Sequence, residues 1–146
     1  MRVEKDFEEF IELLNKQKVK YLIVGAYALA LYSEPRNTGD IDVFVESSKE
    51  NAEKILKVLE LFGFGEIGIT FEDLISENMV VQLGVPPVRI DILTSISGVK
   101  FKEAYNSKVE HKFGNSKTYF LSKENMIINK KASGRKKDLA DLESLM

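Results

Sequence analysis

The stretch YLIVGAYALALYSEPRNTGDIDVFV, residues 21–45, contains the pattern that decides the fold. Its first four residues, Tyr21–Val24, are continuously apolar and predict a buried strand. Residues 26–32 are rich in alanine and leucine and predict a helix, and a loop with proline and glycine follows. Residues 40–45 alternate polar and apolar side chains and then become β-branched and aromatic, which predicts a second strand. The stretch is therefore a strand–helix–strand unit.

The hydrophobic spacing outside this unit predicts further helices and strands. Ser47 and Glu50 have the spacing of a capping box and predict the start of a helix that ends before Gly63. The other predicted helices cover residues 3–16, 71–77, 99–105, 122–132 and a segment after Gly134, and the other predicted strands cover residues 79–83, 88–93 and 118–121. Strands alternate with helices early and then follow one another. We therefore expect an α+β fold (a mixed α/β arrangement) in which helices pack on a mixed sheet.

Length and composition predict one domain and restrict its chemistry. A chain of 146 residues fits one core, so we expect a single domain over residues 1–146 with a C-terminal helical segment from about residue 122. The absence of cysteine excludes disulfides, thiolate zinc sites and cysteine nucleophiles, and a single histidine argues against a histidine-rich metal site. No apolar run approaches the roughly 20 residues of a membrane span, and the first residues are acidic and amphipathic. We expect a cytoplasmic protein.

Charge is distributed unevenly along the chain. Residues 1–97 carry 10 Lys and Arg against 17 Asp and Glu, whereas residues 98–137 carry 11 against 3. An acidic body with a basic C-terminal third suits a protein that holds cations on one wall of a site and phosphates on another. A solvated basic surface is the alternative explanation.

Three aspartates form the strongest candidate site. Asp40 and Asp42 are two residues apart on a predicted strand, so their side chains face the same side. Asp91 lies between Ile90 and Ile92 in the same kind of pattern on a later strand. Because like charges that close repel, a hard divalent ion such as Mg²⁺ would resolve the conflict, and a third carboxylate on an adjacent strand would complete a two-metal site. We expect the three to converge at one open edge of the sheet. The alternative is that Asp40 and Asp42 are solvent-facing residues of an exposed strand.

A glycine precedes the helix of the unit. Gly25 followed by Ala26 would let the backbone approach a phosphate closely, and the N-terminus of the helix presents unpaired N–H groups to anions. Together with the aspartates, this pattern indicates a nucleotide-phosphate site.

The stretch 21–45 resembles the polymerase-β-like nucleotidyltransferase superfamily, in particular the branch of minimal nucleotidyltransferases and abortive-infection toxin-type nucleotidyltransferases. That branch has an apolar strand, Gly-Gly or Gly-Ser, and then Arg-x-Thr-x-Asp-hydrophobic-Asp. The corresponding residues here are Gly25-Ala26, Arg36, Thr38, Asp40 and Asp42, with alanine replacing the usual second residue of the pair. The resemblance extends to KKASGRKKDLADL, residues 130–142. It implies that Asp40 and Asp42 bind both metals, with Asp91 as the third carboxylate.

The loop residues of the motif have two interpretations. Arg36 either clamps a phosphate or forms an ion pair with Glu34 or Asp42. Thr38 is expected to shape the loop through a side-chain-to-backbone hydrogen bond.

The basic cluster near the C-terminus also has two interpretations. On one, Lys130 and Lys136 neutralise the triphosphate of the nucleotide; on the other, the cluster is a set of solvated helix ends. Asp138 and Asp141 are expected to pair locally or to cap the last helix.

The predicted activity is nucleotidyl transfer. A nucleoside monophosphate would pass from a nucleoside triphosphate to an RNA end, a partner protein or a small molecule, with two Mg²⁺ ions that Mn²⁺ can replace. The resemblance also implies a possible place in a toxin–antitoxin system. The alternative is a catalytically inactive relative that binds a nucleotide or a partner, which the alanine at position 26 favours and the three carboxylates oppose.

Overall fold

A computed structural model describes residues 4–33, 39–85 and 88–146. Within these ranges the chain forms helices and strands in an interleaved order. The elements are α1 (Lys5–Lys16), β1 (Tyr21–Val24), α2 (Gly25–Tyr32), β2 (Asp40–Val45), α3 (Lys49–Phe62), α4 (Phe71–Ile75), β3 (Val80–Val85), β4 (Val88–Leu93), α5 (Phe101–Asn106), β5 (Val109–Phe113), β6 (Ser116–Phe120), α6 (Lys123–Ser133) and α7 (Lys136–Leu145). The α+β prediction is confirmed.

The strands form one mixed sheet in the order β3-β4-β2-β1-β6-β5. β2 pairs in parallel with β4, and β1 pairs in parallel with β6, while the other neighbours are antiparallel. The sequential order of strands is therefore not their spatial order. As a result, β2 and β4, which carry the three predicted acids, are interior strands that lie side by side.

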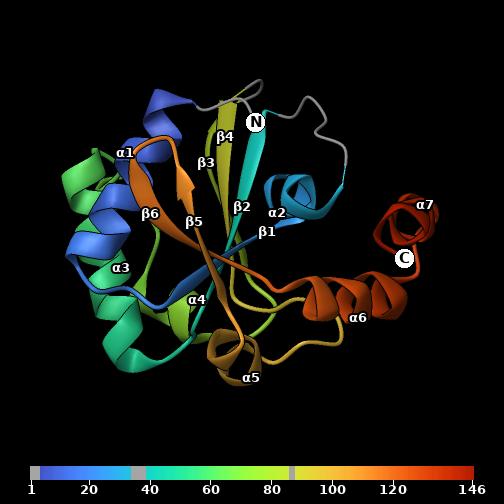
Figure 1. Ribbon diagram of the computed structural model, residues 1–146. Coiled ribbons are helices and arrows are strands. Elements are labelled where there is room, and N and C mark those ends of the chain that lie inside the picture. Colours follow the sequence, from blue (N-terminus) through green and yellow to red (C-terminus); the bar gives the residue numbers. More distant parts are fainter. Residues whose placement is uncertain (1–3, 34–38, 86–87) are drawn as a thin grey trace.

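Helices lie on both sides of the sheet (Figure 1). α1 and α3 cover one face, and α2, α6 and α7 lie on the other. Side chains alternate between these two faces, so Ile41 and Ile90 are buried toward α1 and α3 while their aspartate neighbours point to the opposite side. The apolar half of each strand pattern thus anchors the sheet, and the polar half is left to form a site.

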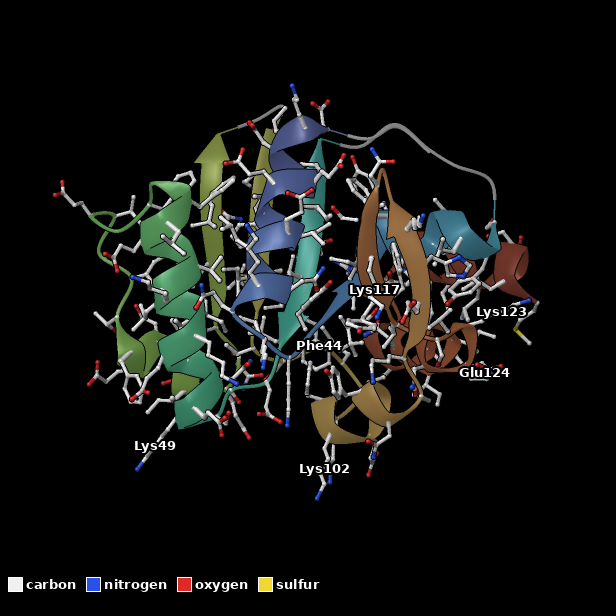
Figure 2. The ribbon with its side chains drawn as sticks, turned by 60° about the vertical axis from the view of Figure 1, so that its left-hand side comes forward. Phe44, Lys49, Lys102, Lys117, Lys123 and Glu124 are labelled. Atoms are coloured by element: carbon white, nitrogen blue, oxygen red, sulfur yellow. The ribbon has the colours of Figure 1, made fainter. Side chains whose placement is uncertain are left out.

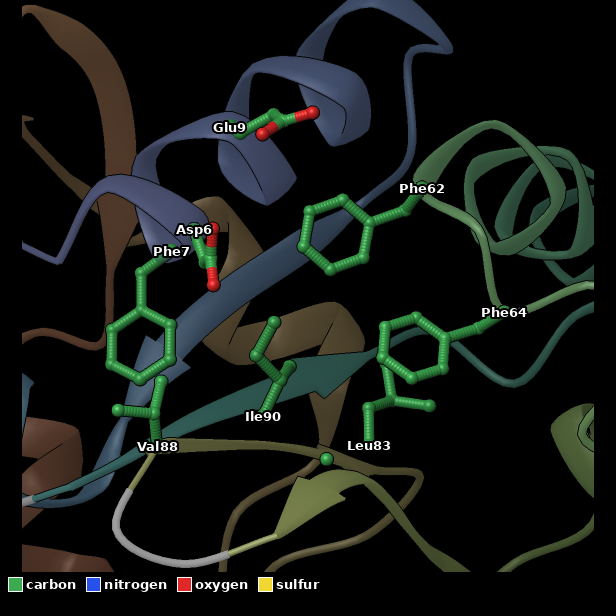
Figure 3. A pocket seen from close by; sticks show the side chains of 9 residues that line it. Asp6, Phe7, Glu9, Phe62, Phe64, Leu83, Val88 and Ile90 are labelled. Atoms are coloured by element: carbon green, nitrogen blue, oxygen red, sulfur yellow. The ribbon is translucent and has the colours of Figure 1, made fainter.

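The α1–α3 face contains a pocket of about 300 Å³, most of whose lining side chains are apolar (Figure 3). Its floor and walls include Phe7, Phe62, Phe64 and Ile90, and two acidic residues of α1 line its mouth. None of its lining residues comes from the three-aspartate set. The pocket is separated from the aspartates by the sheet itself.

Buried polar contacts fix the junction of β1, β2 and α3. The side chain of Asn51, only 2% exposed, accepts a hydrogen bond from the Lys20 amide and donates to the carbonyl oxygens of Lys20 and Glu46. Ser48 caps α3 by accepting from the amide of Asn51. The prediction that Ser47 and Glu50 form the capping box is therefore wrong by one residue, because the cap bond is made by the second serine.

Aromatic contacts close the end of the sheet near α5. Phe44 of β2 is buried, and its ring packs edge-on against that of Phe101, with the ring centroids 5.1 Å apart. Figure 2 shows Phe44 within the body of the protein, whereas Lys49 and Lys102 extend outward from it. In the part of the chain that the structure describes, no helix combines the length and apolarity that a membrane crossing requires.

Candidate functional site

The strand register brings the three predicted aspartates together. In the parallel pairing of β2 with β4, Asp42 lies opposite Asp91, and Asp40 lies opposite Arg89. Paired residues of neighbouring strands share a face, so all four side chains point toward the side of α2, α6 and α7. The expectation of adjacent strands is met. The location differs from the predicted sheet edge, because the acids lie on interior strands.

Gly25 fits closely against this cluster. It is the first residue of α2 and has a φ of +66°, a conformation that glycine adopts without strain. A Cβ at this position would overlap the carboxylate of Asp42. A side chain is unfavourable here for two independent reasons, and the helix N-terminus lies directly beside Asp42. Ala26 follows as the second residue of the helix and is half-buried.

The environment of Asp42 disfavours its ionised form. Burial raises the pKa of Asp42 to about 6 from its usual 3.8, and repulsion from Asp91 and Asp40 adds to the increase. The positive charges of Arg89 and Lys137 act in the opposite direction but do not cancel it. A cation placed among these acids would therefore gain a strong interaction.

Arg89 is hydrogen-bonded to two of the three acids. Its Nε donates to Asp91 Oδ1 at 2.8 Å, and its Nη2 donates to Asp40 Oδ2 at 2.9 Å and to Asp91 Oδ2 at 3.1 Å. Hydrogen bonding to Asp91 raises the pKa of Arg89, so the guanidinium is charged at all relevant pH values. Sequence reasoning did not select this residue. The two-residue spacing of Arg89 and Asp91 was the signal that could have found it, because it places both on one face of β4.

The donor set fits a hard divalent cation in its chemistry. Mg²⁺ and Mn²⁺ prefer oxygen ligands, and three carboxylates on one face supply them. Among the described residues, no group of three or more His, Cys, Asp and Glu side chains is already assembled at metal-binding spacing. Arg89 and the carboxylates would have to rearrange to admit an ion.

A polar pocket of about 470 Å³ opens beside the cluster. Gly25 and Asp42 line one wall, and Lys130, Ser133 and Arg135 of the α6–α7 junction line another. Asp42 of β2 and the basic residues Lys130 and Arg135 thus line the same cavity. Its volume is in the range of sites that bind small ligands.

Lys130 is engaged in a buried ionic network. It is 7% exposed, and its Nζ lies 3.1 Å from Asp141 Oδ2 and 3.3 Å from Asp138 Oδ1. Arg135 and Ser133 also donate hydrogen bonds to Asp138. Burial opposes the ionisation of Asp138, but these hydrogen bonds outweigh it and lower its pKa. The expectation that Asp138 and Asp141 pair locally is confirmed.

The other predicted lysine has a different position. Lys136 is exposed in the first turn of α7 and is not among the described residues that line the pocket. Its neighbour Lys137 acts on Asp42 through its charge, and Arg135 lines the pocket. The basic segment therefore approaches the acids through Arg135 and Lys137 as well as through Lys130, the one predicted lysine that lines the pocket. Arg36 and Thr38 lie outside the described residues.

Comparisons with known proteins identify the family and the fold. Residues 2–146 match the family described as a nucleotidyltransferase of unknown function (DUF6036). The chain belongs to this family. No curated protein matches the sequence of this nucleotidyltransferase.

Among solved structures, this chain is similar to the lincosamide antibiotic adenylyltransferase LnuA, in a crystal structure with lincomycin bound. The TM-score is 0.59 at 18% sequence identity, and the match covers 97% of this chain and 95% of LnuA. At this identity the likeness shows a common fold. The resemblance to nucleotidyltransferases is confirmed by the family match.

Proposed function

We propose that the protein transfers a nucleoside monophosphate from a nucleoside triphosphate to an acceptor, using Asp40, Asp42 and Asp91 as ligands for two Mg²⁺ ions that Mn²⁺ can replace. The observation that carries the proposal is the parallel register that places Asp42 opposite Asp91 on one face of the sheet. When bound, the ions would neutralise phosphate charge and activate the acceptor. Membership of a nucleotidyltransferase family supports the reaction class.

The charge arrangement around the pocket supports a nucleotide phosphate as its occupant. Arg135, Lys136 and Lys137 stand at and just inside the N-terminus of α7, where the helix dipole is positive. Cations are unfavourable at this end of a helix, and anions are favourable. A triphosphate in the adjacent pocket would relieve the excess positive charge. Gly25 would allow the backbone at the start of α2 to approach the same phosphates.

The reaction requires little covalent participation by the protein. An acceptor oxygen forms a bond to the α-phosphorus, the bond from that phosphorus to the bridging oxygen of pyrophosphate breaks, and a carboxylate of the cluster takes up the acceptor's proton. The residues of the pocket hold the triphosphate and the acceptor in line. The basic side chains at the start of α7 offset the negative charge that develops on the leaving pyrophosphate. Catalysis by positioning and charge is usual for phosphoryl transfer.

The acceptor is an RNA end, a protein side chain or a small molecule. LnuA acts on a lincosamide antibiotic, so the shared fold supports a small-molecule hydroxyl as one acceptor class to test. The basic segment 98–137 supports an RNA acceptor, because lysines bind the phosphate backbone without regard to sequence. We also propose the cytoplasm as the location and a toxin–antitoxin pair as one physiological setting.

The test is transfer of label from each of the four α-labelled nucleoside triphosphates, with Mg²⁺ or Mn²⁺, to mixed RNA, cell protein and small hydroxyl compounds. We expect pyrophosphate release and a labelled acceptor for wild type, and no transfer for Asp42→Asn. Glu60→Gln is the matched control, because Glu60 is a carboxylate on the far helix α3 whose side chain is 68% exposed. Equal transfer by Asp42→Asn and Glu60→Gln would refute the assignment.

A non-catalytic nucleotide-binding protein is the second candidate, favoured by the hydrogen bonds that Arg89 makes to Asp40 and Asp91. This alternative predicts that a nucleoside triphosphate and Mg²⁺ raise the melting temperature without release of pyrophosphate in the presence of any acceptor class.

A further inference from the structure

The guanidinium of Arg89 uses the oxygen atoms that a cation site would need. Three hydrogen bonds of 2.8–3.1 Å join it to both carboxylate oxygens of Asp91 and to one of Asp40. The Arg89 side chain is 22% exposed and that of Asp91 is 10% exposed, so solvent competes only partly for these groups. Arginine bound to carboxylates in this forked way is held firmly.

The position of Arg89 is set by the backbone. It lies two residues before Asp91 on β4, and the parallel register places it directly opposite Asp40 on β2. Its side chain must therefore leave the sheet on the same face as the aspartates. The strand pairing thus places the guanidinium within reach of both aspartates. A change of the Arg89 rotamer alone would break the contact without moving the strands.

We propose that Arg89 is an internal counterion of the carboxylate cluster, which holds Asp40 and Asp91 when no divalent cation is bound and competes with the cation for the same oxygens. This inference rests on the proposed function, because it takes the cluster to be a cation site. Mg²⁺ and Mn²⁺ need direct oxygen ligands in a defined geometry, which the forked guanidinium obstructs. Arg89 is thus a positioning residue that keeps three neighbouring acids compatible before the ion arrives.

The competition has a measurable consequence for cation affinity. If the cation binds only when Arg89 is displaced, the apparent affinity equals the intrinsic affinity multiplied by the fraction of molecules in which Arg89 is displaced. If Arg89 is bound to the aspartates in about two-thirds of the molecules, the apparent affinity for the cation is roughly threefold weaker. If it is bound in about nine-tenths of them, the affinity is roughly tenfold weaker. Removal of the guanidinium should therefore restore the cation affinity that this competition costs.

The experiment is a calorimetric titration of Mn²⁺ into chelator-stripped, nucleotide-free protein. Arg89→Met removes the charge, and Arg89→Lys keeps the charge but loses the fork. Lys137→Met is the matched control, because Lys137 acts on Asp42 through its charge. We expect Arg89→Met to bind Mn²⁺ at least about threefold more tightly than wild type, Arg89→Lys to lie between them, and Lys137→Met to change less than Arg89→Met.

Thermal unfolding supplies a second readout. In EDTA, Arg89→Met should melt below wild type, since the acids have lost their counterion, and saturating Mn²⁺ should reduce or reverse the difference. If Arg89→Met does not fold, Arg89→Lys decides: tighter Mn²⁺ binding than wild type supports the inference, and equal or weaker binding overturns it.

The failures of the two proposals are distinguishable. Equal or weaker Mn²⁺ binding by Arg89→Met, with wild type binding normally, overturns the counterion role and leaves the cation site intact. An equal gain in Arg89→Met and Lys137→Met also overturns it, because the effect would then be a general change of charge. If neither wild type nor Arg89→Met binds Mn²⁺, the cation site itself is wrong and the inference falls with it.

Discussion

Replacement of Lys130 by methionine should destabilise the fold far more than the loss of a surface lysine. Lys130 is 7% exposed, and its ammonium lies within 3.3 Å of both Asp138 and Asp141. Those two aspartates are 1% and 4% exposed. Methionine keeps most of the apolar stem of the side chain and removes the ammonium group, so the substitution leaves two buried carboxylates without their shared cation.

The size of the loss follows from what remains around each aspartate. Removal of one partner of a buried ion pair destabilises a protein by about 3–5 kcal/mol. Asp138 keeps its hydrogen bonds to Arg135 and Ser133, so we expect the lower part of that range, about 3 kcal/mol. Asp141 loses its ion pair with Lys130 as well. The double variant Lys130→Met/Asp141→Asn should therefore recover about 1 kcal/mol or more relative to Lys130→Met alone.

The assay is urea unfolding followed by circular dichroism at pH 7 in EDTA, with Lys131→Met as the matched control on the exposed side of α6. A loss below about 1 kcal/mol for Lys130→Met, the value typical of an exposed ion pair, would refute the buried-network explanation. The same variant tests the sequence-based prediction for Lys130, and Lys136→Met tests it for Lys136. If either lysine contacts the triphosphate, its replacement should weaken binding of a nucleoside triphosphate by about tenfold or more and affect the monophosphate less.

Three further outcomes follow from the structure. Asp42→Asn should stabilise the metal-free protein at pH 7.5 by up to about 3 kcal/mol, because the folded pKa of about 6 exceeds the usual 3.8. Ionisation of Asp42 lowers the stability of the wild type as the pH rises through that interval, so the stability gained by Asp42→Asn should shrink to near zero below pH 4. A pH-independent difference in urea unfolding would contradict this account. Gly25→Ala should lower the free energy of unfolding by at least about 1–2 kcal/mol, since the residue has a positive φ and its new methyl group would meet Asp42; wild-type stability would disprove the close approach. Asn51→Ala should lower it by about 2–3 kcal/mol, because the backbone groups of Lys20 and Glu46 lose their buried partners. Chemical denaturation beside the exposed control Asn106→Ala checks this.

Most of the sheet could be predicted from local patterns. The strand at Tyr21–Val24 is continuously apolar and buried at every position, and Asp40–Val45 buries its apolar members in turn, so hydrophobic periodicity was sufficient. The strand Val109–Phe113 was not predicted. Its three central residues are exposed, and it is an edge strand fixed by its hairpin partner, so no apolar period marked it.

The geometry of the candidate site could be predicted only in part. The spacing of the aspartates was enough to place them on one face, because strand geometry repeats every two residues. The choice between Lys136 and Lys137 depended on the rotation of α7, which tertiary packing determines. The burial of Lys130 could not be predicted either, since a lysine is buried only when partners are present. Its partners lie eight and eleven residues away in a different helix.

The strand order has a consequence for how the protein reaches its native state. The central strand β1 pairs with β6 through Ile23 and Phe120, and the partners Asp40 and Arg89 are also far apart in sequence. Such non-local parallel pairing closes long loops before it gains contacts, which slows folding. During synthesis the acidic strands would emerge well before the basic helices α6 and α7. A ribosome-bound chain would therefore have its carboxylates in place before the opposite wall of the pocket exists, and the complete cavity is acquired only when the last helices dock.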